Sequence, residues 1–207
     1  MCCSRCCTPS VNGSKIKKSL LLCYFLDILQ ALPALFRSAD LLKFTGNANV
    51  FLTRALERGY ITRLTRGVYV NSRLKAGPSL EEAACFVRTP SYISAEWALH
   101  KHGVIIQVPT VCTVVTLSTA VGITRNLHWR GVTIEYSHIS DRLYFGFEAR
   151  DGFNLAMPEK ALLDCIYYRN AAPFEDELEL EGVDTGRLQE MAQSFPVRVR
   201  EIVGKLS

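Results

Sequence analysis

The sequence predicts an α+β protein in which an N-terminal winged helix-turn-helix precedes a mixed α/β C-terminal domain. Residues 37–71 predict the first part, because two short helical patterns and a tight turn precede a basic β-hairpin. Further along, β-branched runs alternate with helical patterns, which predicts the second part. The 207 residues, 48% of them hydrophobic, suffice for two small cores. We expect a disordered tail over residues 1–18, the winged helix over 19–75 and the second domain over 76–207.

Eight cysteines fall into two groups. The first group crowds the predicted tail: Cys2, Cys3, Cys6 and Cys7. This tail either is disordered or reflects a start codon placed upstream of the true one; the alternative is a soft-metal site, although closed zinc sites usually take paired ligands separated by a longer loop. The second group lies singly within apolar stretches: Cys23, Cys85, Cys112 and Cys165. These surroundings predict small core residues in a reducing compartment.

Residues 15–32 allow two interpretations. A lysine-rich start followed by an apolar run has the outline of a secretory signal, but Asp27 and Gln30 interrupt that run. We favour a first helix packed behind the recognition unit, with an apolar stripe of Leu22, Leu26, Leu29 and Leu32. No later segment is long and apolar enough to span a bilayer, so we expect a cytoplasmic protein with no membrane partner.

Two short helices with a turn between them are predicted over residues 38–58. Ser38 is a good N-cap for the first helix, and Gly46 suits its end because the residue after a helix often adopts a positive φ. Asn47 or Asn49 can cap the second helix. Apolar residues in that helix have the spacing of a buried stripe: Phe51, Leu52, Ala55 and Leu56. Gly59 is predicted to end it.

A basic hairpin follows the second helix. Residues 61–64 and 68–70 are β-prone and flank a turn, Thr65-Arg66-Gly67, with Arg63 and Arg66 at or near its tip. The outward face of the helix keeps polar side chains: Asn49, Thr53, Arg54, Glu57 and Arg58. Arginine can bind guanine, asparagine can bind adenine, and threonine can bond a base or a phosphate, so the unit is predicted to bind double-stranded DNA. The alternative is that Arg54 and Arg58 are merely a solvated helix face.

Charge is divided unevenly along the chain. Residues 1–75 hold 12 Lys and Arg against 3 Asp and Glu, whereas the remainder holds 12 against 17. The overall net charge of +4 therefore conceals a strongly basic part joined to an acidic one. Only the first part is suited to a polyanion.

The second domain is predicted from its periodic patterns. Helices are expected over residues 79–87 and 94–102, from Pro158 at the first helical position, and after Asp184. Strands are expected over residues 111–117, 127–129, 132–136, 143–148 and 153–156. Arg130-Gly131 is predicted to be a hairpin turn.

Three segments carry a resemblance to a known family. They are the hairpin end Arg66-Gly67-Val68-Tyr69, the helix over residues 94–103 leading to Gln107-Val108-Pro109, and the segment 157–164, which reads Met-Pro-Glu-Lys-Ala-Leu-Leu-Asp. In this order and spacing, from about residue 20 onward, the chain resembles the AbiEi antitoxins of type IV toxin–antitoxin systems, which implies a bacterial protein with a part in phage defence.

The resemblance implies two functions. The first domain would bind inverted repeats in its own promoter and repress transcription; its DNA-binding residues would be Asn49, Thr53, Arg54, Arg58, Arg63 and Arg66. The second domain would counter a nucleotidyltransferase-type toxin, for which direct contact is not required. Glu159, Lys160 and Asp164 carry the family-like motif, and helix capping with contacts inside the domain is the alternative role. The competing hypothesis is a stand-alone transcriptional regulator whose second domain senses a ligand or dimerises.

No enzymatic activity, cofactor or metal is expected. Glu159-Lys160 near Asp151 is only faintly similar to a metal-dependent nuclease site, because the Glu and Lys are adjacent and Pro158 starts a helix. His100 and His102 are two apart on a helix and cannot easily bind one metal.

Two further patterns have a functional and a plainer interpretation. The acidic run over residues 175–181 could imitate nucleic acid, but such runs are more typical of a solvated loop or helix face. Tyr144, Phe145 and Phe147 could form a stacking platform for RNA, but core packing is favoured.

Overall fold

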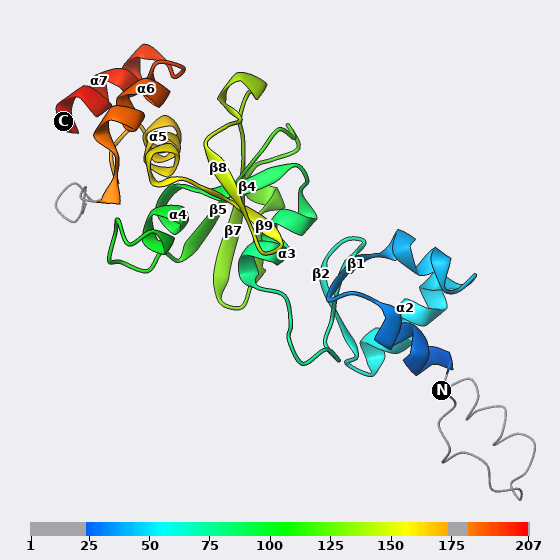
Figure 1. Ribbon diagram of the computed structural model, residues 1–207. Coiled ribbons are helices and arrows are strands. Elements are labelled where there is room, and N and C mark those ends of the chain that lie inside the picture. The colour runs from blue at the N-terminus through cyan, green and yellow to red at the C-terminus, as the bar shows by residue number, and fades with distance from the viewer. Residues whose placement is uncertain (1–23, 174–181, 207) are drawn as a thin grey trace, which may run out of the picture. The chain divides into compact units, whose positions relative to one another are not determined.

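The computed structural model describes residues 24–173 and 182–206, and the chain forms two compact units, one ending at Gly77 and the other beginning at Pro78. Both units mix helices and strands, so the protein is α+β (Figure 1). The predicted tail with its cysteine cluster, Cys23 and the acidic run over residues 175–181 lie outside the described residues. No helix within the described ranges has the length and apolar character needed to cross a bilayer.

The first unit consists of helical segments and a three-stranded antiparallel sheet. Its described part opens with a helix over residues 24–31. The remaining elements follow in chain order: β1 (Leu35–Arg37), the 3-10 helix η1 (Ser38–Lys43), α2 (Ala48–Glu57), β2 (Ile61–Thr65) and β3 (Val68–Asn71). The strand order is β1-β3-β2. This succession of elements is consistent with the predicted winged helix-turn-helix.

A small core holds the first unit together. Phe25 from the N-terminal helix packs on Phe51 of α2, with ring centroids 4.6 Å apart. Phe36, Leu41 and Leu29 are also buried. Asn71, fully buried at the end of β3, donates from Nδ2 to the carbonyl oxygens of Leu29 at 2.8 Å and Leu32 at 3.2 Å. The end of the hairpin is therefore tied to the end of the N-terminal helix.

Three predictions for the first unit were wrong in detail. Gly46 does not end the first helix through a positive φ, because η1 ends at Lys43 and Gly46 has no positive φ. Ser38 does not cap an α-helix: Ser38–Lys43 is a 3-10 helix, and the N–H of Arg37 at the cap position donates to the Asp40 carboxylate at 2.8 Å. The Ser38 N–H instead donates to the Gly67 carbonyl at 2.9 Å, which links η1 to the hairpin turn. Leu56, predicted to be buried, is 38% exposed, because α2 ends one residue later and Leu56 lies at the margin of its packed surface.

The second unit is built on a mixed six-stranded sheet. Its strands are β4 (Ser91–Ser94), β5 (Val111–Thr116), β6 (Leu127–Trp129), β7 (Val132–His138), β8 (Phe147–Arg150) and β9 (Phe153–Ala156). The spatial order is β6-β7-β5-β4-β9-β8, in which the pairs β5–β7 and β4–β9 are parallel and the others antiparallel. Arg130 and Gly131 both have positive φ and form the predicted turn between β6 and β7.

Helices cover this sheet. They are α3 (Leu80–Val87), α4 (Ala95–Lys101), α5 (Pro158–Arg169), α6 (Thr185–Ala192) and α7 (Val197–Leu206), with two short 3-10 helices, η2 (Ile123–Arg125) and η3 (Asp141–Leu143). Helix α5 packs on β4 and β9, and α6 and α7 pack on α5 (Figure 1). Ser79 caps α3: its Oγ accepts from the Glu82 N–H at 3.0 Å, while its own N–H donates to the Glu82 carboxylate at 2.6 Å.

Most predicted elements of the second unit are confirmed, and one strand was wrong. Instead of a strand over residues 143–148, η3 ends at Leu143 and β8 begins at Phe147, because Gly146 has a φ of 74° and turns the chain between them. The aromatic residues there pack against the core, as favoured: Tyr144 contacts both Tyr92 and Phe147 edge-on, and the rings of Tyr92 and Phe147 stack on each other with centroids 4.7 Å apart. Cys85, Cys112 and Cys165 are buried free thiols, which confirms them as core residues.

Candidate nucleic-acid interface

The outward face of α2 presents most of the predicted reading residues together. Asn49, Thr53 and Arg54 are exposed, and with Val50 and Glu57 they line one shallow hollow on the surface of the helix. The apolar residues of α2, Phe51, Leu52 and Ala55, face the core. The helix is therefore amphipathic, with its polar side open to solvent.

The side chains on this face differ in how freely they can bind a ligand. The Thr53 hydroxyl donates to the Asn49 carbonyl oxygen at 3.0 Å, so its hydrogen is already engaged and its oxygen can still accept. Within the described parts of the chain, the Arg54 guanidinium has no hydrogen bond or ion pair, and neither does the Asn49 amide. Both groups keep their full hydrogen-bonding capacity for a base edge or a phosphate.

Arg58 occupies a different position from the other reading residues. It is the C-cap residue of α2, and its guanidinium carbon lies 5.4 Å from the centroid of the Phe25 ring. A cation over an aromatic face at this distance is attracted by the ring quadrupole. The structure thus directs Arg58 toward the N-terminal helix and away from the hollow that the other four polar residues line.

The hairpin β2–β3 carries the other two predicted residues. Arg66 is exposed in the turn, where Gly67 has a φ of 76°. Arg63 is also exposed, and its Nε donates to the Thr65 carbonyl oxygen at 3.3 Å, so it lies along the hairpin beside a bulge in β2. Because α2 packs on both η1 and β2, the helix and the hairpin are held in one unit.

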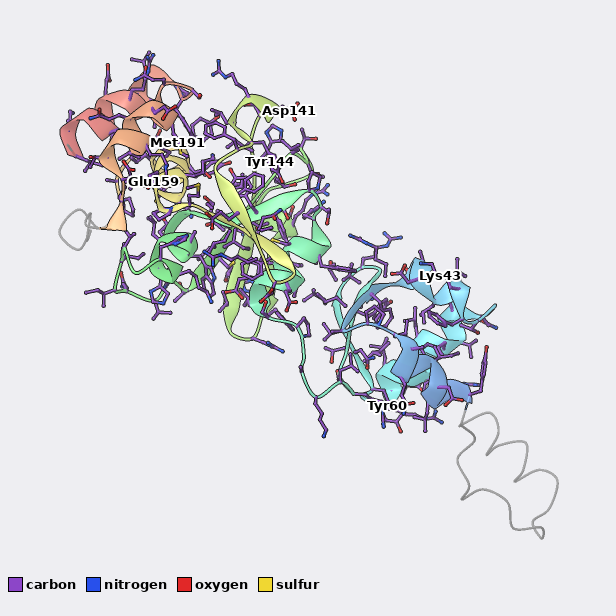
Figure 2. All side chains as sticks on the ribbon, in the orientation of Figure 1. Lys43, Tyr60, Asp141, Tyr144, Glu159 and Met191 are labelled. Atoms are coloured by element: carbon purple, nitrogen blue, oxygen red, sulfur yellow. The ribbon has the colours of Figure 1, made fainter. Side chains whose placement is uncertain are left out.

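The unit that carries these elements is basic. Residues 24–77 hold eight Lys and Arg residues against three Asp and Glu residues. Besides Arg58 and Arg63, two more basic side chains have partners inside the unit: Lys43 lies 3.7 Å from Asp40, and the Arg73 guanidinium lies over the Tyr60 ring at 4.9 Å. Figure 2 shows Lys43 and Tyr60 on opposite sides of this unit. The positive charge left on α2 and the hairpin suits a polyanion.

Two exposed apolar residues near the N-terminus of α2 were not predicted as surface features. Val50 is 41% exposed in the hollow described above, and Leu42 is 67% exposed beside a second hollow that reaches from η1 to Asn49. Val50 falls outside the predicted buried stripe of α2, so helical periodicity agrees with its exposure, whereas the sequence gives no signal that Leu42 is exposed.

The second unit buries the family-like motif of α5. Lys160 and Asp164, one helical turn apart, form an ion pair in which both side chains are fully buried. The Asp164 carboxylate also accepts from the Tyr92 hydroxyl at 2.9 Å and the Ser94 hydroxyl at 2.7 Å. The sequence reasoning missed Tyr92, because its strand β4 was not predicted.

The environment of this pair is mostly aromatic. The Lys160 ammonium nitrogen lies 5.4 Å from the ring centroids of Tyr92 and Phe145, and 4.9 Å from that of Phe195. Burial raises the pKa of Asp164 and lowers the pKa of Lys160 from their usual values, although each charge opposes the shift of the other. A pair closed off from solvent in this way cannot reach a substrate without opening the core.

Glu159 and the nearby histidines have partners within the second unit. The Glu159 carboxylate is buried and accepts from the Asp184 N–H at 3.0 Å; in Figure 2 it lies in the helical part of the unit, as does Met191 of α6. His100 Nδ1 lies 3.3 Å from the Ile105 carbonyl oxygen, and His102 Nε2 lies 2.8 Å from that of Ala156. In the described ranges, no three His, Cys, Asp or Glu side chains are grouped to hold a metal ion.

A groove in the second unit is lined by both parts of the second family-like segment, the helix over residues 94–103 and Gln107-Val108-Pro109. Its lining includes Glu96 of α4, the segment Gln107-Val108-Pro109 and Arg169 of α5. Arg169 bridges two carboxylates, at 3.2 Å from Glu96 and 2.5 Å from Glu135. Neither Glu135 nor Arg169 stood out in the sequence, because each lies in an ordinary amphipathic pattern and only the fold brings them together.

Comparison with known proteins supports the assignment of the first unit. Residues 26–72 match the family AbiEi_4, described as "Transcriptional regulator, AbiEi antitoxin". This match confirms the predicted resemblance over the first unit and supports a general role as an antitoxin or transcriptional regulator. No curated protein matches the chain.

Proposed function

We propose that the chain is a DNA-binding antitoxin that represses its own operon. The first unit, as a winged helix-turn-helix, binds inverted repeats in promoter DNA through α2 and the hairpin β2–β3. The second unit counters a nucleotidyltransferase-type toxin, and this action does not need a stable complex. The protein acts in the cytoplasm, where its promoter and its toxin are found, and has no enzymatic activity of its own.

One observation carries the DNA-binding half of the proposal. Arg54 and Asn49 are exposed on one face of α2 and have no side-chain partner among the described residues, in the same basic unit that matches a family of transcriptional regulators. Recognition helices place such side chains in the major groove, where arginine and asparagine read base edges. Arg66 in the hairpin turn is available for a neighbouring phosphate.

The antitoxin half rests on the family match and on the position of the family-like motif. Because Glu159, Lys160 and Asp164 are buried and bonded within the second unit, we assign them to the stability of that unit. We assign no reaction to them, since a substrate cannot reach side chains that are at least 97% buried.

A second function is favoured by where the family match ends. The match stops at residue 72, within the first unit, so it does not extend to the segment that would act on a toxin. The groove lined by Glu96, Gln107 and Arg169 gives the second unit a place for a small polar ligand. A stand-alone regulator that senses such a ligand, or that dimerises through its second unit, is the alternative.

A reporter assay tests the DNA-binding half. The promoter of the chain's own operon is fused to a reporter, and the full chain or its Arg54→Ala/Arg66→Ala variant is supplied separately. We expect the wild type to lower reporter output and the variant to lose most of this repression. Equal repression by both proteins would contradict the proposed interface.

A growth assay separates the two candidate functions. Cells express the product of the neighbouring gene alone, with the full chain, or with the Arg54→Ala/Arg66→Ala variant, which keeps the second unit intact. Rescue by both proteins supports an antitoxin that acts through the second unit. If the neighbouring product is toxic and neither protein restores growth, the antitoxin half fails and the stand-alone regulator is the better reading.

A further inference from the structure

Among the described residues that line the hollow on the outward face of α2, Val50 has the one apolar side chain. The other lining residues, Asn49, Thr53, Arg54 and Glu57, are all polar. Val50 is 41% exposed, whereas its neighbours Phe51 and Leu52 are only 5% and 7% exposed. The valine therefore does not serve the core of the unit, and its methyl groups are available to a ligand.

The position of Val50 on the helix is central to this face. Successive helical residues are offset by about 100°, so these five residues span an arc of about 140°, with Val50 and Glu57 near its middle. Val50 is also the third residue of α2, close to its N-terminus. In helix-turn-helix proteins the N-terminal residues of the recognition helix contact the base edges.

Only one apolar group is displayed in the major groove of unmodified DNA, and it is the C5 methyl of thymine. The polar residues around Val50 can bond bases and phosphates, but the valine side chain has no hydrogen-bonding atom. Its one favourable contact with a base edge is apolar. Against a polar base edge, the valine side chain would displace water from the base atoms without replacing their hydrogen bonds, which costs free energy.

We propose that Val50 reads the methyl group of a thymine in the major groove and so fixes at least one base of the recognised sequence. This inference rests on the proposed DNA-binding function and adds a specificity-determining residue to it. Burying one methyl group corresponds to about 0.8 kcal/mol, which is about fourfold in affinity. Arg54 and Asn49 then read neighbouring bases by hydrogen bonds.

Deoxyuridine substitution tests this contact, because uracil differs from thymine only by the missing methyl. The full chain first selects duplexes from a random-sequence pool, and each thymine of the enriched sequence is then replaced in turn by deoxyuridine. We expect about a fourfold loss of wild-type affinity at one or two positions. Val50→Ala should bind the thymine duplex more weakly and should be insensitive to deoxyuridine at those positions.

Leu56→Ala is the matched control. Leu56 is 38% exposed on the same helix but lies outside the arc of the hollow, so this variant should keep the wild-type response to deoxyuridine. Circular dichroism confirms that both variants are folded. If no thymine position responds, or if the response persists in Val50→Ala, the Val50 contact is overturned and DNA binding stands. If no sequence is enriched at all, the proposed DNA-binding function itself falls, together with this inference.

Discussion

The buried pair of Lys160 and Asp164 makes a quantitative prediction for the second unit. Lys160→Met removes the cation and leaves the Asp164 carboxyl buried without a counter-charge. Removing one partner of a buried ion pair costs about 3–5 kcal/mol of unfolding free energy. Because Asp164 still accepts from the hydroxyls of Tyr92 and Ser94, we expect a loss of about 3 kcal/mol at neutral pH.

This loss should increase with pH. Burial raises the pKa of Asp164, and in Lys160→Met no cation opposes that shift. Above about pH 4 the folded variant then keeps a proton on Asp164 that the unfolded chain has lost. Since the folded state binds more protons, its unfolding free energy falls as pH rises, by up to about 1.4 kcal/mol per pH unit, until the folded carboxyl itself ionises.

Urea unfolding followed by tryptophan fluorescence measures this effect. The chain has two tryptophans, Trp97 and Trp129, and both lie in the second unit, so the signal reports that unit alone. Wild type, Lys160→Met and the uncharged double variant Lys160→Met/Asp164→Asn are compared at about pH 5 and about pH 8. When the pH rises from the lower to the higher value, only Lys160→Met should lose unfolding free energy relative to wild type. The reasoning is refuted if the unfolding free energy of Lys160→Met lies less than about 1 kcal/mol below that of wild type at the higher pH, or if this difference is the same at both pH values.

Three further variants test single contacts. Asn71→Ala leaves the carbonyls of Leu29 and Leu32 without their donor and should destabilise the first unit by about 1–3 kcal/mol. Amide hydrogen exchange over residues 24–77 should become faster. Unchanged exchange argues against a stabilising role of the two Asn71 hydrogen bonds. Ser79→Ala removes the cap of α3 and should cost the second unit about 1 kcal/mol by tryptophan fluorescence, so an unchanged midpoint contradicts the capping role. Arg58→Ala should destabilise the first unit by about 0.5–1 kcal/mol without changing the salt dependence of DNA binding; a slope smaller by about 0.9 would place Arg58 on a phosphate.

Elements with strong local signals were predictable from sequence. Ser79 and Glu82 have the spacing of a capping box, and both make the expected bonds at the start of α3. Arg130-Gly131 forms a hairpin turn, and Pro158 opens α5. In each case residues close in sequence supply the interactions that define the structure.

Elements that depend on distant partners were missed. β1 has only three residues, Leu35–Arg37, and exists as a strand because it pairs with β3 more than thirty residues later. β4 contains two serines and leads directly into α4, so no turn signal separates it from the helix. Both strands are stabilised by pairing across the sheet, which a local pattern does not encode.

The candidate site was predictable to a similar degree. The polar face of α2 followed from helical periodicity, and Asn49, Thr53 and Arg54 are exposed on it together. The contact of Arg58 with Phe25 depends on how the N-terminal helix packs, which periodicity does not specify. Lys160 and Asp164 have the spacing of an ion pair, but their burial depends on β4 and on Phe195 from the end of the chain.

The salt dependence of DNA affinity tests the central claim most directly. Fluorescence anisotropy with promoter DNA compares wild type, Arg54→Ala/Arg66→Ala and the control Arg187→Ala/Arg200→Ala, which removes the same charge from exposed positions of the second unit. If Arg54 contacts a base and Arg66 a phosphate, the double variant loses affinity and its slope of log K against log salt falls by about 0.9, while the control keeps the wild-type slope. An unchanged slope and affinity for Arg54→Ala/Arg66→Ala would contradict DNA binding through α2 and the hairpin.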